Sequence, residues 1–378
     1  MATDPAAISV NVNFLACFVL FAASRPNRRV WLAAAGLGAC LGACLGFHGN
    51  LIERALQALS FCGAGAIPAV WVMPLLTKHS DLKLLLKLLF PPFFGFFASF
   101  FLNIGSHGLT YDHFLYAFDG SLGFQPSFWA GRLVTATPLI GEFTRALYTA
   151  LPIFLVIAYL IVERRGSAAA RRLFVLLLLV GVCGAACYLV FPAVGAYWLF
   201  SKSFPLNPPA LSTVSLAPAL VKAAVARNCM PSLHTAWALV AFWAAGKCGW
   251  LWRWTLRALL LIMLLQTLAY HYLADMIVAV PFTLALYAIT QGGIPWSAIE
   301  RRAAAGFGIA TVGLWLVALR WGTGLFLSSP MIPWCAALVT VVGGAWMWRK
   351  LDRVGESRTA GEVEPQTQAI AVAAGSAA

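Results

Sequence analysis

The chain has 378 residues, of which 61% are hydrophobic and 10% charged, and its mean hydropathy is +0.82. Soluble domains carry roughly a quarter charged residues, so this composition excludes an ordinary soluble globule and predicts a polytopic integral membrane protein. The net charge is +13, but the basic residues stand in short clusters between apolar runs, which argues against nucleic-acid binding. The nine cysteines show no metal-binding spacing and lie mostly in apolar runs, where a cysteine behaves as a small hydrophobe.

Eleven apolar runs are interpreted as transmembrane spans of an all-α helix bundle. The first run has no Lys or Arg before it, so we interpret it as a retained helix and not as a cleavable signal peptide. The predicted spans are 8–24, 30–47, 55–75, 84–104, 143–162, 173–191, 232–249, 256–270, 272–290, 304–326 and 331–348.

The basic clusters fall in alternate connections between these spans and hold 19 of the 26 Lys and Arg residues. They are Arg25, Arg28, Arg29, Lys78, Lys83, Lys87, Arg164, Arg165, Arg171, Arg172, Lys247, Arg253, Arg257, Arg301, Arg302, Arg349, Lys350, Arg353 and Arg358. Because positive connections stay in the cytoplasm, we expect the N-terminus outside and the C-terminus inside.

Three segments depart from the pattern of spans. Residues 105–141 mix aromatics, Gly, Pro and Asp, and are expected to lie on the outer leaflet as an interfacial segment. Residues 192–231 form a Pro-rich outer loop, and residues 351–378 lack aromatics and are expected to be disordered. The predicted organisation is therefore four N-terminal helices in 1–104, a six-helix membrane core in 105–291, two C-terminal helices in 292–350 and a tail from 351.

Two of the six histidines, His234 and His271, are expected to meet at the outer membrane face. His234 belongs to Pro-Ser-Leu-His at the start of the seventh span, and His271 belongs to His-Tyr-Leu-Ala-Asp at the start of the ninth. The 36 residues between them are enough for two crossings, which return the chain to its starting face. Only the rotation of the helices, which the sequence does not define, decides whether the two imidazoles touch.

Asp275 follows His271 by four residues and therefore shares its helix face. A carboxylate at membrane depth is costly, and one that holds an imidazole raises the basicity of its other nitrogen. The alternative is an inert His–Asp pair at a helix end. The hydroxyl of Ser232 and the amides of the same first turn are candidates to hold a phosphate. Zinc bound by two His and one Asp is a rival interpretation, but no further Cys, His or Glu has a suitable spacing, so we expect neither metal nor cofactor.

These residues resemble the type-2 phosphatidic acid phosphatase superfamily, which includes lipid phosphate phosphatases, haloperoxidases and sphingolipid phosphotransferases. Its second motif, Pro-Ser-x-His, is similar to the segment from Pro231 to His234, and its third motif ends in His-x-x-x-Asp, as do His271 and Asp275. The resemblance implies that His271 becomes a phosphohistidine, that Asp275 orients it and that His234 protonates the leaving group.

The chain departs from the phosphatase pattern at two phosphate-binding cations. The Ser-Arg pair expected six residues before the nucleophile is Leu264-Leu265 here, and a first motif of Lys-x6-Arg-Pro is absent. The inositol phosphorylceramide and sphingomyelin synthases share this loss, and their His-Tyr-x-x-Asp motif is more similar to this chain. Arg227 and Lys222 are candidates to replace the cations, and the alternative is that both are ordinary loop charges.

The resemblance, which covers about residues 105–291, implies a lipid phosphotransferase or phosphatase at the outer face of a bacterial inner membrane. Its expected partners are a phospholipid, sphingolipid or polyprenyl-phosphate substrate and the surrounding membrane lipids. Two other classes stay open: a multi-span lipid transporter or flippase, and a catalytically inactive scaffold, which Leu264 and Leu265 favour. The sequence does not predict the oligomeric state or the particular lipid.

Overall fold

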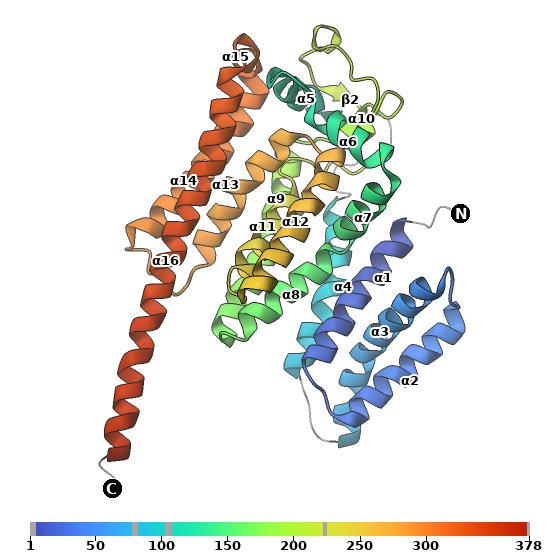
Figure 1. Ribbon diagram of the computed structural model, residues 1–378, viewed down its shortest axis with the longest axis vertical. Coiled ribbons are helices and arrows are strands. Elements are labelled where there is room, and N and C mark those ends of the chain that lie inside the picture. Colours follow the sequence, from blue (N-terminus) through green and yellow to red (C-terminus); the bar gives the residue numbers. More distant parts are fainter. Residues whose placement is uncertain (1–4, 78–81, 103–107, 222–224, 376–378) are drawn as a thin grey trace.

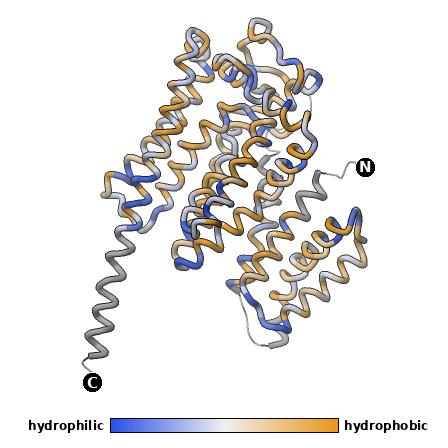
Figure 2. The backbone as a smooth tube through the Cα atoms, viewed as in Figure 1, coloured by the Kyte–Doolittle hydropathy of each residue, from blue (hydrophilic) through white to orange (hydrophobic). Residues whose placement is uncertain are grey.

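The computed structural model describes residues 5–77, 82–102, 108–221 and 225–375, and these are mostly helical (Figure 1). The all-α prediction holds except for two short strands, β1 (Leu109–Thr110) and β2 (Ala219–Leu220), which pair antiparallel. Figure 2 shows hydrophobic residues along most of the helices and hydrophilic residues gathered mainly at helix ends and connections. This distribution suits a bundle whose middle lies in hydrocarbon.

The N-terminal group consists of α1 (Pro5–Ala23), α2 (Arg28–Leu45), α3 (Leu51–Thr77) and α4 (Leu82–Leu102). Asn27 begins α2 as its N-cap, since its side chain accepts a hydrogen bond from the Val30 N–H over 3.0 Å. Gly38 lets α2 approach α3 closely, because a Cβ there would lie 2.8 Å from backbone atoms of Cys62. The apolar cluster inside this group includes Val156 of the next helix group, so the two groups share packing.

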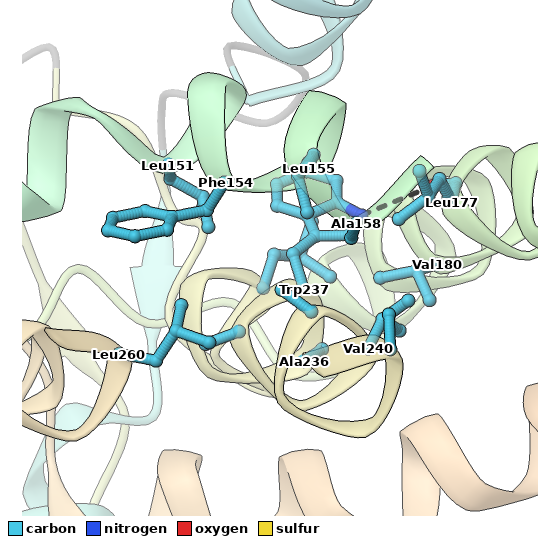
Figure 3. Close-up of a cluster of buried hydrophobic side chains, with 14 of the residues drawn as sticks. Leu151, Phe154, Leu155, Ala158, Leu177, Val180, Ala236, Trp237, Val240 and Leu260 are labelled. Atoms are coloured by element: carbon cyan, nitrogen blue, oxygen red, sulfur yellow. Dashed lines mark hydrogen bonds between the residues drawn. The ribbon is translucent and has the colours of Figure 1, made fainter. Parts of the chain in front are cut away.

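The central group of helices contains both histidine motifs. It consists of α7 (Pro138–Thr149), α8 (Leu151–Glu163), α9 (Ser167–Val190), α11 (Leu233–Ala245), α12 (Trp250–Tyr270) and α13 (Leu273–Thr290). Figure 3 shows its core, in which Leu155, Trp237 and Leu260 come from three different helices. The Trp237 indole N–H donates to the Leu177 carbonyl over 3.2 Å, which satisfies the one polar atom of that large side chain.

A layer that we name the cap covers one end of the central group, at the top of Figure 1. It comprises β1, α5 (Asp112–Ser121), α6 (Pro126–Ala136), α10 (Ala196–Leu199), the 3₁₀ turn η1 (Leu211–Thr213) and β2. Its aromatic core includes Tyr116, Phe118 and Phe128, all fully or almost fully buried. The described residues 108–136 thus form a short strand and two short helices over the bundle, and the interfacial position expected for 105–141 stays a prediction.

The C-terminal group is α14 (Ile299–Trp321), α15 (Thr323–Ser328) and α16 (Met331–Gly375). Lys247, in the α11–α12 connection, forms ion pairs with Asp352 and Glu356 of α16, at 3.1 and 2.7 Å. The helix α16 is traced to Gly375, and the disordered tail predicted for 351–378 stays a prediction. The Ala, Glu and Gln of this segment favour helix even though their low hydrophobicity gives no reason to bury it.

Among the residues that the structure describes, seven helices are long and apolar enough to cross a membrane, or eight if α7 and α8, bent by 52°, form one span. The predicted number of about eleven is therefore not confirmed. The seventh predicted span, 232–249, is the short helix α11, and the tenth, 304–326, is divided between α14 and α15. Hydropathy detects apolar runs but does not show where a short helix ends inside the bundle, which is why the count differs.

Candidate active site

The structure brings the two histidine motifs to the same end of the central group, beneath the cap. His271 is the C-cap residue of α12 and has an extended backbone, whereas Asp275 lies in the first turn of α13. The prediction that the two residues share one helix face is therefore wrong, because the chain changes helix between them. The Ser232 N–H donates to the Asp275 carbonyl oxygen over 3.1 Å, so the start of α11 is bonded to the start of α13. The return of the chain through α11 and α12, together with the bonding of these helix ends, places all four motif side chains in one region.

His271 and Asp275 are in contact within this region. The distance from His271 Nδ1 to Asp275 Oδ2 is 3.5 Å, and both side chains are buried. Asp275 Oδ2 also accepts from the Tyr272 N–H over 3.0 Å. This second bond holds the carboxylate in place, so it can orient the imidazole at Nδ1 and leave Nε2 as the nitrogen available for reaction.

Cys229 is a third member of this cluster, which sequence reasoning missed. Its Sγ lies 3.2 Å from His271 Nδ1, and its N–H donates to the Ala193 carbonyl over 3.1 Å. Burial raises the pKa of the Cys229 thiol well above its usual value, so the group is a neutral thiol with an S–H to donate. The residue stands two positions before Pro231, and its place beside a motif was the only signal available to the sequence analysis.

His234 lies in the first turn of α11, and its ring packs face to face on Tyr148 of α7. The two ring centroids are 3.8 Å apart and the ring planes differ by 9°. Tyr148 in turn meets Tyr270 edge to face at 5.4 Å, and His234 interacts electrostatically with His271. Tyr148 therefore connects the second histidine to the end of α12, where the first one lies.

The helix α7 is itself fixed against α12 by a buried polar pair. The Thr144 hydroxyl donates to Gln266 Oε1 over 2.9 Å. Tyr148, one helical turn after Thr144, stacks on the His234 ring. Arg145 points away from this stack and forms an ion pair with Glu142. Arg145 also interacts electrostatically with Tyr270, which precedes His271. It is therefore a cation near the cluster that the sequence analysis did not consider.

The three predicted phosphate-binding residues differ in their surroundings. Ser232 is fully buried and is the N-cap of α11, since its Oγ accepts from the N–H and the hydroxyl of Thr235 over 3.3 and 3.1 Å. Arg227 is 1% exposed, and its guanidinium donates to the carbonyls of Gly108, Val221 and Val225. Lys222 lies outside the described residues.

These contacts give Arg227 a role inside the cap. Burial lowers the pKa of its guanidinium, and the nearby Asp112 carboxylate opposes that shift. Because its donors already serve three backbone carbonyls, the side chain joins strand β2 and its neighbours to the rest of the cap. A role for Arg227 in phosphate binding stays a prediction.

Two buried carboxylates of α5 fasten the cap to the site. Asp119 accepts from the Leu273 and Ala274 N–H groups over 2.8 and 3.2 Å, and so caps the first turn of α13. Burial raises the pKa of Asp119 to about 8, although the two backbone N–H bonds oppose the shift. Asp112 accepts from the N–H groups of Val194 and Gly195, at distances down to 2.8 Å.

Gly195 is placed where only a glycine fits. Its φ is +90°, and a Cβ there would lie 2.3 Å from the Tyr270 carbonyl oxygen and 2.9 Å from Cys229 Sγ. The backbone of the loop that contains Gly195 therefore passes directly over the end of α12. Asp112 holds that loop from the other side, so the position of the cap against the cluster is defined by backbone contacts.

The arrangement has two chemical possibilities. An imidazole held at one nitrogen by a carboxylate, with a second imidazole nearby, can attack an electrophile and transfer protons. In addition, single ligand atoms of Cys229, His271 and Asp275 lie within 4.8 Å of one another, which is close enough to share a metal ion. The rival zinc interpretation in the sequence used both histidines, whereas the structure groups a thiol with only one of them.

Comparison with known proteins gives one match. No curated protein and no solved structure matches the chain. A model of the PAP2 superfamily matches residues 113–289, a little under half of the chain, from α5 to the end of α13. The matched segment contains Pro231 to His234, His271 and Asp275, and the match supports the superfamily, without confirming the inositol phosphorylceramide synthase-like branch.

Proposed function

We propose that this membrane protein transfers or hydrolyses a lipid-linked phosphate through a phosphohistidine formed on His271. The observation that carries the proposal is the contact of His271 Nδ1 with the buried Asp275, on the segment that matches the PAP2 superfamily. In the tautomer that donates Nδ1–H toward Asp275, the lone pair of Nε2 is free to attack phosphorus. His234, which lies in the same region, is the candidate to manage the proton of the leaving group.

The reaction proceeds in two balanced steps. In the first, Nε2 of His271 forms a bond to phosphorus, the bond from phosphorus to the lipid alkoxide breaks, and His234 gives its proton to that oxygen. In the second, His234 removes the proton from water or from an acceptor alcohol, whose oxygen attacks phosphorus and releases His271. An alkoxide is a poor leaving group without a proton, so His234 matters in both steps.

The proposed site faces the outside of the membrane. Nineteen of the 26 basic residues fall in the connections opposite to the histidine motifs, which is the cytoplasmic side by the positive-inside rule. The cap would then lie at the outer surface. The His-Tyr-x-x-Asp form of the third motif favours transfer to an alcohol, as in the inositol phosphorylceramide synthase-like branch, over hydrolysis.

The proposal is tested with purified protein in detergent and a panel of phosphatidic acid, phosphatidylinositol and a polyprenyl phosphate. Release of phosphate or headgroup is measured with and without an added lipid alcohol. We expect His271→Ala to lower the rate by at least about a thousandfold and His234→Ala by about a hundredfold or more. His48→Ala, at an exposed position in the N-terminal group, serves as the matched control and should retain full activity.

A trapped intermediate separates the proposed mechanism from other kinds of activity. Substrate labelled at phosphorus should leave an acid-labile, base-stable label on the wild type and on His234→Ala, but not on His271→Ala. Activity that survives His271→Ala would overturn the mechanism. A wild type without activity on any of the lipids would favour the transporter or scaffold classes instead.

A further inference from the structure

The strongest feature that the proposed reaction leaves unused is the thiol of Cys229. It lies 3.2 Å from His271 Nδ1, on the side of the ring away from the nitrogen that reacts, and is 2% exposed. A phosphohistidine mechanism needs a carboxylate at Nδ1 but gives no role to a thiol there. The pairing of sulfur, imidazole and carboxylate is instead the ligand chemistry of zinc and similar divalent cations.

The spacing of the three side chains fits such an ion. With bond lengths of ~2.3 Å to sulfur and ~2.1 Å to nitrogen or oxygen, tetrahedral zinc separates its S and N ligands by about 3.6 Å and its N and O ligands by about 3.4 Å. The observed separations are 3.2 Å for Cys229 Sγ and His271 Nδ1, and 3.5 Å for His271 Nδ1 and Asp275 Oδ2. Side-chain movements of a few tenths of an ångström bring both pairs to these values.

A second observation at the same place also indicates a cation. Asp275 is fully buried, and its Oδ1 atom has no hydrogen-bond partner among the described residues. An ion bound at Oδ1 would satisfy that buried atom.

We propose that Cys229, His271 and Asp275 form a binding site for a soft divalent cation such as Zn²⁺, and that the bound ion inhibits phosphoryl transfer. This inhibition rests on the proposed function, because it acts on the proposed nucleophile. An ion on Nδ1 withdraws electron density from the imidazole and takes the carboxylate that raises its basicity, so Nε2 loses nucleophilicity. Three protein ligands leave a fourth position for water or a phosphate oxygen.

The site is tested by spectroscopy, independently of activity. The purified full-length protein is stripped with a chelator and titrated with Co²⁺, which gives an intense ultraviolet charge-transfer band when it binds a thiolate. We expect the band in the wild type, its loss on addition of Zn²⁺, and its absence in Cys229→Ser. Cys183→Ser, at a partly buried thiol of α9, is the matched control and should keep the band.

Two further measurements complete the test. Zn²⁺ should raise the melting temperature of the wild type but not that of Cys229→Ser, which also shows that the variant is folded. Zn²⁺ in excess should lower phosphate release by at least about tenfold, and a chelator should restore it.

The outcomes separate the two proposals. A wild type without the band, or the same band in Cys229→Ser, would overturn the metal site. Activity that a chelator abolishes and Zn²⁺ restores would overturn inhibition. A thiolate band in a protein without any phosphate release would support the site and remove the proposed function.

Discussion

Replacing Tyr148 by leucine should slow the proposed reaction by removing the ring that holds His234. The rings of Tyr148 and His234 are stacked at 3.8 Å and 9°. Leucine keeps most of the bulk of the tyrosine and removes the aromatic face. Phenylalanine keeps the face and removes only the hydroxyl, so Tyr148→Phe is the matched control.

The size of the effect follows from the stack. An aromatic pair of this kind is worth about 0.5–1.5 kcal/mol beyond the area that it buries. If that energy keeps His234 in its productive orientation, its loss lowers kcat by roughly twofold to tenfold. KM should change little, because the ring orients a proton donor and does not bind the substrate in this mechanism.

The assay compares two leaving groups on the same lipid phosphate. With a lipid alkoxide, which needs a proton, Tyr148→Leu should show the full decrease in kcat. With a nitrophenolate, which leaves without a proton, the decrease should disappear. An equal loss with both leaving groups, or an equal loss in Tyr148→Phe, would refute the idea that the stack positions a general acid.

Three other changes test the cap and the missing cations. Gly195→Ala should lower the melting temperature by several degrees more than Gly123→Ala. Both positions have a positive φ, but only at Gly195 would a Cβ lie 2.3 Å from a carbonyl oxygen. Similar shifts in the two variants would contradict the close approach. Burial raises the pKa of Asp119 to about 8, so its protonated form is favoured in the folded state, and stability present below pH ~4 should be lost as the pH rises through about 8. Melting temperatures from pH 5 to 9 should therefore fall less in Asp119→Asn than in the wild type. Parallel curves for the two proteins would show that Asp119 does not titrate with a raised pKa. If Arg145 replaces the cations of the phosphatase pattern, Arg145→Gln should raise KM for a lipid phosphate about tenfold. Arg132 is an exposed arginine of α6 that donates to the carbonyls of Pro205 and Leu206, so Arg132→Gln is the control and should leave KM unchanged. Equal effects would argue against a phosphate contact.

The pairing of the motifs is the part of the site that could be read from the chain. The 36 residues between His234 and His271 allow two crossings, and the structure bonds the Ser232 N–H to the Asp275 carbonyl as that return requires. Chain length suffices for this return, because it is set by two helix lengths. The 3.5 Å contact of His271 with Asp275 does not follow from one helix face, since it joins the extended C-cap residue of α12 to the first turn of α13.

Partners from distant parts of the chain could not be read in this way. Tyr148 and His234 are far apart in sequence, and their stack depends on how α7 rotates against α12 through Thr144 and Gln266. Asp119 was visible as an acid in an interfacial stretch, but its bonds to the first turn of α13 depend on where the cap settles.

The amino-acid sequence alone was enough to predict a membrane protein, alternating basic connections and two histidine motifs that belong together. These conclusions depend on composition, on period and on the number of residues between motifs, which are properties of the chain alone. The bonds from Arg227 to backbone carbonyls and the contact of Cys229 with His271 Nδ1 became visible in the folded protein. Such contacts depend on helix rotation and on loop paths, which packing sets to within an ångström and which no local pattern encodes.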